Sequence, residues 1–208
     1  MIVKLRNADD SFKKSIIIPT VTYPLNGEIS TFTYENTKEV TDENILSIID
    51  SVPYKISFCY ENTTRIVEKL QEAGYDAVPY VGWLFMARSE FPVHHCWCVL
   101  NGESVIDLAD NFNKLFDFIA KSEERDNNAE VFIRFEQEAR KHKNRERCAT
   151  VGVPSANLLY VGSPCEPEKG RQIYRRLIAE MPDHECQRNC NANGYNRTQQ
   201  KFAEAGLM

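Results

Sequence analysis

Cys59, His95 and Asp107 are residues whose types could together carry out nucleophilic catalysis. Cys59 stands where a helical pattern begins, and the free N–H groups of a helix N-terminus favour a thiolate and can bind an oxyanion. His95 precedes Trp97 in a strand-like run, and Asp107 interrupts an apolar one. A thiol, an imidazole and a carboxylate supply a nucleophile, a base and a group that orients the base.

Asp107 is informative because a lone acid in an apolar strand is seldom buried without a partner. An imidazolium on the neighbouring strand would be such a partner. The two strands flank Asn101-Gly102, a strong hairpin signal. A two-residue turn would place Asp107 on the side of His94, whereas a three-residue loop with a glycine bulge would place it on the side of His95. His95 is the predicted base, and His94 is the alternative.

A helix and three strands must position these groups. At 100° per residue, the apolar side chains of residues 59–73 fall on one face, which predicts a helix with Gly74 as its C-cap. A shorter helix is predicted over 41–51. Strands are predicted over 77–85, 93–100 and 104–108. A helix followed by an antiparallel sheet is typical of the α+β class.

The rest of the chain is predicted to add strands before this core and helices after it. The expected strands are 2–5, 15–23, 30–34 and 157–161, and the expected helices are a charged amphipathic one over 121–147 and two more over 167–181 and 197–205. Asp110 is expected to be an N-cap for the segment starting at Asn111. We therefore expect a single domain over 1–208, with a catalytic core over about 41–120 and a helical C-terminal region over about 121–208.

Composition excludes several classes of protein. The 208 residues carry 25 basic and 30 acidic side chains, a net charge of −5, which argues against the basic stripe of a nucleic-acid-binding protein. No segment has the ~20 uninterrupted apolar residues of a membrane span, and the N-terminal residues lack the apolar region of a secretory signal. Seven scattered cysteines without such a signal favour free thiols in a reducing, cytoplasmic setting.

The segment from Cys59 to Asp107 resembles the core of the transglutaminase-like cysteine hydrolase superfamily, a circularly rearranged relative of papain. That family shows a cysteine, a helix, a strand bounded by glycines, a His-x-Trp strand and an aspartate. Here Gly74 follows Cys59 by 15 positions, Gly82 follows Gly74 by 8, and residues 95–97 supply His-x-Trp. The short interval between that histidine and Asp107 is most similar to bacterial members such as the leader peptidases of lasso-peptide maturation.

The resemblance implies a papain-like fold in which a nucleophile helix packs on an antiparallel sheet, with additional C-terminal helices. It also implies that Cys59, His95 and Asp107 are the catalytic residues and that no cofactor is required. The chain departs from the family pattern twice. The arginine usual after the first glycine is absent, with Val78 near its place, and Asp107 is followed by Leu-Ala-Asp.

An aromatic run lies just before His95 and is expected to form one wall of a substrate cleft, with Tyr80, Trp83 and Trp97 as candidate contacts. Such a wall suits apolar or amide-bearing side chains, which indicates a protein or peptide substrate and neither nucleic acid nor a membrane as partner. The oligomeric state is left open. No metal site is predicted, because the spacing in the remaining cluster is not that of a zinc knuckle; its members are Cys165, His184, Cys186 and Cys190.

The sequence thus predicts a thiol-dependent hydrolase that attacks an amide bond of a protein or peptide through an acyl-enzyme intermediate. Water as the acceptor would make it a peptidase or a glutamine deamidase, and an amine as the acceptor would make it a transamidating acyltransferase. The alternative from another class is a non-catalytic member of the same fold that binds a peptide or protein. A complete set of Cys59, His95 and Asp107 favours the enzyme.

Overall fold

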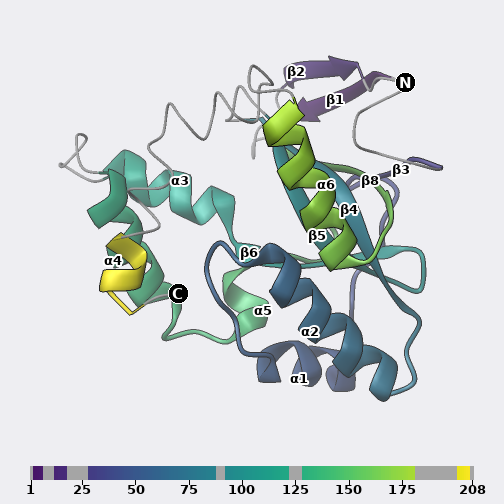
Figure 1. Cartoon of the computed structure of the whole chain (residues 1–208). Coiled ribbons are helices and arrows are strands. Elements are labelled where there is room, and N and C mark those ends of the chain that lie inside the picture. The colour runs from purple at the N-terminus through teal and green to yellow at the C-terminus, as the bar shows by residue number, and fades with distance from the viewer. Residues whose placement is uncertain are drawn as a thin grey trace.

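The computed structural model describes residues 2–6, 12–17, 28–87, 92–121, 128–180 and 201–206. A two-stranded hairpin, β1 (Ile2–Arg6) with β2 (Phe12–Ile17), precedes a six-stranded antiparallel sheet that carries the helices (Figure 1). The strand order of this sheet is β3 (Ser30–Phe32), β8 (Leu158–Pro164), β4 (Ala77–Met86), β5 (Val93–Leu100), β6 (Ser104–Asp110) and β7 (Cys148–Gly152). The helices are α1 (Glu43–Ser51), α2 (Cys59–Glu72), α3 (Phe112–Lys121), α4 (Asn128–Ala139), α5 (Asn144–Arg147) and α6 (Pro167–Glu180).

The six-stranded sheet curls until its two sides meet. Three strands separate β7 from β8 in the sheet, yet only residues 153–157 connect them along the chain. The hydroxyl oxygens of Thr150 on β7 and Tyr160 on β8 lie 2.9 Å apart. Strand twist makes such curling natural, and it gives the sheet a concave inner face with its own core. That core consists of Phe32, Leu84, Met86, Trp97, Val99, Val105, Leu158 and Tyr160.

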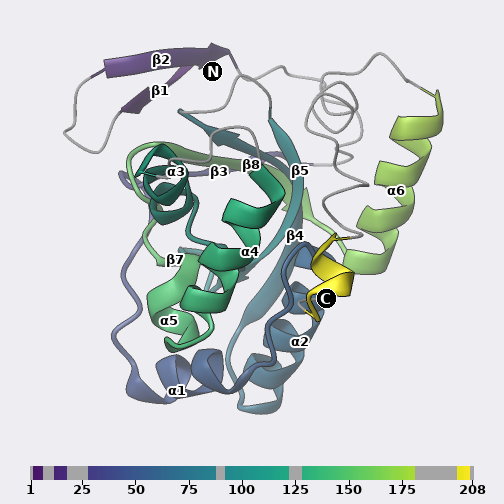
Figure 2. The ribbon, with the colours of Figure 1, turned by 90° about the vertical axis from the view of Figure 1, so that its left-hand side faces the viewer.

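The outer face of the sheet carries α2 and α6. Ile66 and Leu70 of α2 pack with Cys98 of β5 and Ile106 of β6, because the apolar stripe of the helix meets every second residue of the strands. The helix α6 lies across β4 and β5 beside α2, whereas α3 and α4 lie on the other side of the molecule (Figures 1 and 2). Successive residues of β5 therefore belong to two different cores.

A close approach between backbones occurs at Gly82 of β4. This residue pairs with Gly162 of β8 on one side and with His95 of β5 on the other. A Cβ atom at position 82 would lie 2.1 Å from the carbonyl oxygen of Val161 and 2.6 Å from the Cα of Gly162. Only a glycine fits at this position of β4, which lies between β8 and the strand that holds His95.

The α+β class predicted from the sequence is confirmed, and so are most of the elements of the core. The helix α2 ends as expected, since Gly74 has a φ of 86° and Tyr75 donates to the carbonyl of Leu70. The predicted strand over 15–23 is seen up to Ile17, and its remaining part lies outside the described residues. The predicted helix over 197–205 is seen over 201–204; residue 205 is in a turn, and 197–200 lie outside the described residues.

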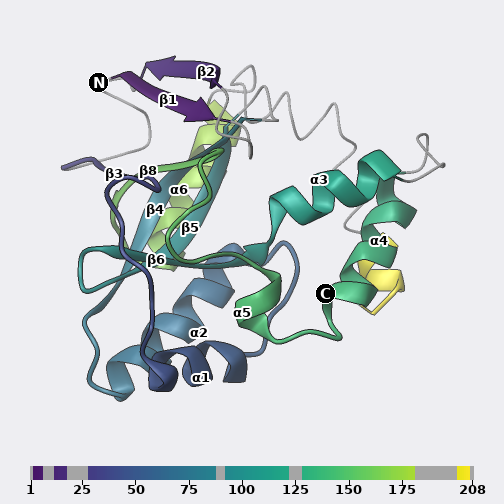
Figure 3. The ribbon, with the colours of Figure 1, turned by 180° about the vertical axis from the view of Figure 1, so that it is seen from behind.

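Two local predictions were wrong, and one strand was missed. The single helix over 121–147 is divided into α4 and α5, because Asn144 donates to the carbonyls of Ile49 and Val52 and so turns the chain toward α1 (Figure 3). The strand β7 was not predicted. The N-cap after β6 is Asn111 and not Asp110, because the Asn111 side chain accepts from the backbone N–H of Lys114 at 3.1 Å.

Within the described residues, no helix is both long and apolar enough to cross a bilayer.

Candidate active site

Cys59 is the first residue of the 14-residue helix α2 and is partly exposed. The preceding loop, residues 53–58, reaches the helix through Ser57, whose φ of 62° is unusual for a residue other than glycine. The side chain of Asn62 holds this loop, because it accepts from the backbone N–H of Lys55 at 3.2 Å and donates to its carbonyl at 2.7 Å. It also donates to the carbonyl of Leu108 on β6 at 3.1 Å. Asn62 thus ties the start of α2, where Cys59 stands, to the strand that carries Asp107.

His95 and Asp107 lie side by side on the inner face of the sheet. Of the two turns considered for the hairpin between β5 and β6, the structure has the three-residue loop, since Leu100 pairs with Ser104. This register puts the aspartate on the same face as His95, and the imidazole Nε2 lies 2.9 Å from each carboxylate oxygen. Both side chains are buried, at 4% and 1% exposure.

Asp107 is held by more than the imidazole. Its Oδ1 accepts from the backbone N–H of Ala109 at 3.1 Å, and its Oδ2 accepts from the hydroxyl of Tyr160 at 2.8 Å. Because the phenol has a single proton, which it donates to Asp107, Thr150 must be the donor in its own bond to Tyr160. The curl of the sheet therefore fixes the orientation of the carboxylate.

Tyr160 and Thr150 were not singled out from the sequence. The signal available was a phenol within the apolar run 158–161, since a buried tyrosine hydroxyl needs a partner. The partner could not be named, because the contact depends on β7 and β8 coming together.

The charge state of His95 follows from its neighbours. Burial by itself lowers the pKa of this imidazole, but the charge and hydrogen bond of Asp107, together with the hydrogen bond and charge of Cys59, raise it to about 10. His95 is therefore an imidazolium at neutral pH. Since Nε2 faces the carboxylate, Nδ1 is the ring nitrogen left for the thiol of Cys59.

Cys59 and His95 line a common pocket of about 220 Å³. Its walls come from the loop before α2, from α2 itself, from β5 and β6, and from Phe132 of α4. The lining residues are Tyr54, Lys55, Ile56, Ser57, Cys59, Asn62, Val93, His94, His95, Leu108, Ala109 and Phe132. A substrate carbonyl in this pocket would reach the thiol and the first N–H groups of α2 together, which is the arrangement that acyl transfer requires.

His94, the alternative base, has different partners. Its Nδ1 lies 2.7 Å from the hydroxyl of Tyr60, and its ring stacks on Tyr174 of α6 with centroids 4.9 Å apart. Trp83 packs edge-on against the same ring at 5.1 Å. His94 is thus part of the packing between the sheet, α2 and α6, and Asp107 pairs with His95 instead.

The three aromatic residues expected in the cleft lie elsewhere. Trp97 is fully buried in the inner core, and Trp83 is buried beneath α6 with Leu177. Tyr80 packs edge-on against Phe32 and stacks on Trp97. None of the three lines the pocket at Cys59, because their side chains pack in the cores on the two faces of the sheet.

The second cluster of possible ligands cannot be placed in full. Cys165 follows β8 and is partly exposed, whereas His184, Cys186 and Cys190 lie outside the described residues. Among the residues that the structure does describe, no group of three or more His, Cys, Asp or Glu side chains could hold a metal ion.

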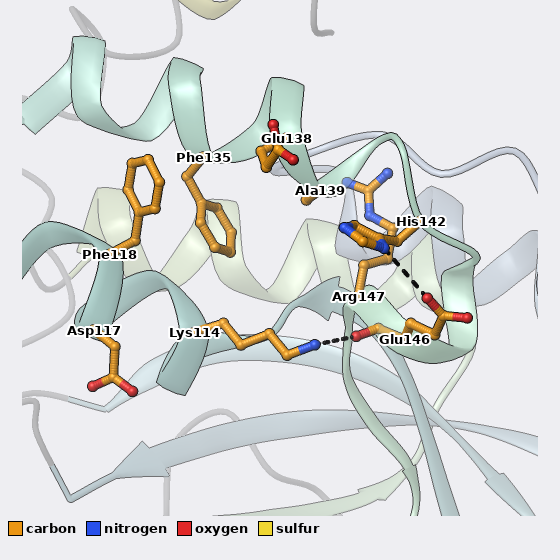
Figure 4. Close-up of a pocket in the computed structure, with 9 residues that line it drawn as sticks. All are labelled: Lys114, Asp117, Phe118, Phe135, Glu138, Ala139, His142, Glu146 and Arg147. Carbon is orange, nitrogen blue, oxygen red and sulfur yellow. Dashed lines mark hydrogen bonds and ion pairs between the residues drawn. The ribbon is translucent and has the colours of Figure 1, made fainter.

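A second pocket, of about 340 Å³, lies among α3, α4 and α5 (Figure 4). Phe118 and Phe135 stand together at one end, and His142 and Arg147 stand at the other. Glu146 draws this end together, because its carbonyl accepts from Lys114 and its carboxylate pairs with His142 at 3.4 Å. No thiol lines this pocket, whereas Cys59 lines the other one.

Replacing Tyr160 with phenylalanine is expected to slow alkylation of Cys59 by about tenfold, because a hydrogen bond to a charged group contributes about 1.5–3 kcal/mol. Burial, followed by the charge of Asp107, raises the pKa of Tyr160, so the hydroxyl is a permanent donor in the wild type. The rate of iodoacetamide labelling at Cys59 measures the effect, with Thr150→Val as a control that removes only the outer hydroxyl. Equal labelling rates in Tyr160→Phe and the wild type would show that the carboxylate does not depend on the phenol.

Comparisons of the chain with protein-family models, with curated proteins and with solved structures give no match. The relation to the transglutaminase-like superfamily therefore stays a prediction from the residues between Cys59 and Asp107.

Proposed function

We propose that the protein is a thiol-dependent hydrolase with a papain-like or transglutaminase-like catalytic core, and that it acts on an amide bond of a protein or peptide. The observation that carries the proposal is the buried pair of His95 and Asp107 beside a cysteine that begins a helix. Cys59 is the nucleophile, His95 the general acid and base, and Asp107 the group that orients the imidazole.

In the first half of the reaction, the Cys59 sulfur forms a bond to the substrate carbonyl carbon, and the oxyanion is stabilised by N–H groups in the first turn of α2. The C–N bond then breaks, and the leaving amine or ammonia takes the proton of the His95 imidazolium. In the second half, His95 removes a proton from water, which attacks the thioester carbonyl and releases Cys59. Cys59 and His95, which exchange bonds and protons with the substrate in both halves, line one pocket.

The surroundings of the other thiols support this role for Cys59 by comparison. Burial raises the pKa of Cys98 to about 12, and burial is also the largest cause that raises the pKa values of Cys96 and Cys165. Cys59 is the described cysteine beside the imidazolium of His95. A binding protein of the same fold would have no use for a carboxylate that holds an imidazolium against a thiol, so hydrolysis is favoured over binding alone.

The test is to incubate the protein with cell lysate and to map new N-termini and glutamine-to-glutamate changes by mass spectrometry. Cys59→Ala is the inactive variant, and Cys165→Ala is the matched control, since that thiol lies outside the pocket. We expect products that depend on Cys59 and not on Cys165. New N-termini would identify a peptidase and converted glutamines a deamidase, whereas incorporation of an added amine would identify the transamidase. If no product depends on Cys59, the protein is a binding module and the proposal is overturned.

A further inference from the structure

The described walls of the pocket at Cys59 carry positive charge and no carboxylate. Among the described residues that line it there is no aspartate or glutamate, whereas Lys55 and the imidazolium of His95 each bring a positive charge. Asp107 compensates the imidazolium from behind, because its carboxylate is 1% exposed and does not line the pocket. The charge of Lys55 is therefore the one that a ligand in this pocket could compensate.

Lys55 stands four residues before Cys59, and its backbone is held in place. Asn62, which is 2% exposed, accepts from the backbone N–H of Lys55 and donates to its carbonyl. One buried side chain thus binds both backbone polar groups of this residue. The Lys55 side chain itself is exposed. A fixed backbone position at the edge of the pocket therefore carries a charged side chain that reaches into solvent.

The ammonium of Lys55 lies beside the residue that precedes Cys59. Its Nζ is 5.5 Å from the centroid of the Phe58 ring. An exposed contact between a cation and a ring is weak, so the flexible stem of the lysine can turn the ammonium toward a ligand. Lys55 forms no ion pair with a described carboxylate, and Glu61 in the first turn of α2 binds Arg171 instead. The ammonium is thus available to an acidic group that enters the pocket.

We infer that Lys55 determines specificity by binding a carboxylate of the substrate that lies next to the amide attacked by Cys59. An ammonium and a carboxylate form a charge-assisted hydrogen bond, which is stronger than a neutral one. The inference rests on the proposed function and adds the substrate class, a peptide or protein segment with an acidic group beside the reacting amide. This group is either the side chain of an aspartate or glutamate or the carboxylate at the end of a chain.

The test compares two reagents that alkylate Cys59 with release of iodide and differ in charge. Iodoacetate carries a carboxylate, and iodoacetamide has a neutral amide in its place. We expect Lys55→Gln to lower the ratio of the iodoacetate rate to the iodoacetamide rate by about three- to fivefold, as for an exposed charge pair. Lys55→Arg should keep the ratio, because it keeps the charge. The ratio does not respond to changes in thiol reactivity that affect both reagents alike.

Lys69→Gln is the matched control. It removes the same charge from an exposed position, but Lys69 lies in the last turn of α2, at the opposite end from Cys59. Its ratio should equal that of the wild type. In about 1 M NaCl the effect of Lys55→Gln should disappear, because the Debye length falls to about 3 Å. An unchanged ratio in Lys55→Gln, or an equal fall in Lys69→Gln, would overturn the inference.

The lysate experiment distinguishes the two sources of the carboxylate. Aspartate or glutamate next to the sites that depend on Cys59 would identify a side chain, and reaction at the last amide of a protein would identify the chain end. Both kinds of product should decrease in Lys55→Gln and persist in Lys69→Gln. Sites without an acidic neighbour, with yields that do not depend on Lys55, would contradict the inference.

Failure of the inference differs from failure of the proposed function. The labelling ratio reports the charge beside the thiol, whereas the lysate experiment reports turnover. Turnover that depends on Cys59, with a ratio that does not depend on Lys55, would leave the hydrolase and remove this specificity. A ratio that falls in Lys55→Gln without any turnover would leave a carboxylate-binding site at a reactive cysteine and remove the hydrolase.

Discussion

Replacing Asp107 with asparagine is expected to slow the proposed reaction by about 10³- to 10⁴-fold while the fold is retained. Asparagine has nearly the same shape but no charge, so it neither stabilises the imidazolium of His95 nor fixes its tautomer. Its amide NH₂ would also face one of the groups that now donate to the carboxylate, which are Tyr160, the backbone of Ala109 and His95. A modest fall in melting temperature is expected as well.

The pKa of His95 determines how Asp107→Asn changes the pH dependence. The pKa of His95 is raised to about 10, so the pair with Asp107 stabilises the fold fully below the ordinary value near 6.5, and this contribution is lost as pH rises through about 10. Asp107→Asn removes the charge that raises the pKa of His95, so the alkaline limit of Cys59-dependent turnover should move to lower pH, because the imidazolium that protonates the leaving group then loses its proton at lower pH. Rates of Cys59-dependent turnover across pH measure the shift. Asp50→Asn is the control, because Asp50 is bound to Arg145 and not to the site. If the pH profile of Asp107→Asn equals that of the wild type, the pair of His95 and Asp107 has a structural role alone.

Replacing Gly82 with alanine is expected to destabilise the protein by about 3 kcal/mol or more, which lowers the melting temperature by roughly 6–12 °C. The added methyl would meet backbone atoms of Val161 and Gly162, and backbone atoms in a paired strand cannot move aside as a flexible side chain can. The clash would push β8 from β4, and with it Tyr160, which pairs with Leu84 two residues along. Cys59 labelling should therefore fall together with stability.

Gly74→Ala is the matched control for Gly82→Ala. Nothing lies within 4 Å of the Cβ that an alanine would have at position 74, but its φ of 86° is unfavourable for a side chain. The expected cost is about 1 kcal/mol, with no effect on Cys59 labelling. Urea unfolding curves of both variants measure the difference. Equal midpoints would mean that β4 and β8 can separate without strain.

The elements that place Cys59, His95 and Asp107 could be predicted because their signals are local. A stripe of apolar residues marks α2, and an Asn-Gly pair marks the hairpin between β5 and β6. The choice between His94 and His95 could not be made from this pair, which fits two registers. The three-residue loop is held by residue 38, whose backbone N–H donates to the carbonyl of Glu103 at 2.9 Å. A contact between residues so far apart in the sequence produces no periodic pattern from which it could be predicted.

The supporting residues of the site escaped prediction for the same reason. Tyr160 reaches Asp107 because the sheet curls, and Asn62 links a loop to a strand 46 positions away. Trp83 and Trp97 were expected at the cleft because they are aromatic and near His95. Side chains along a strand alternate between the two faces of the sheet, and both tryptophans are buried in the cores on these faces.

The position of β8 has a consequence for the synthesis of the chain. Cys59, His95 and Asp107 are all made before residue 108, but β8 pairs with β3 and β4 and is the last strand of the large sheet to leave the ribosome. Until then, one edge of β4 has no partner within the large sheet and is open to pairing with other chains. The carboxylate also lacks its phenol until that strand arrives. A nascent chain that already carries the thiol, the imidazole and the acid would therefore gain its full reactivity in a late step, when β8 closes the sheet.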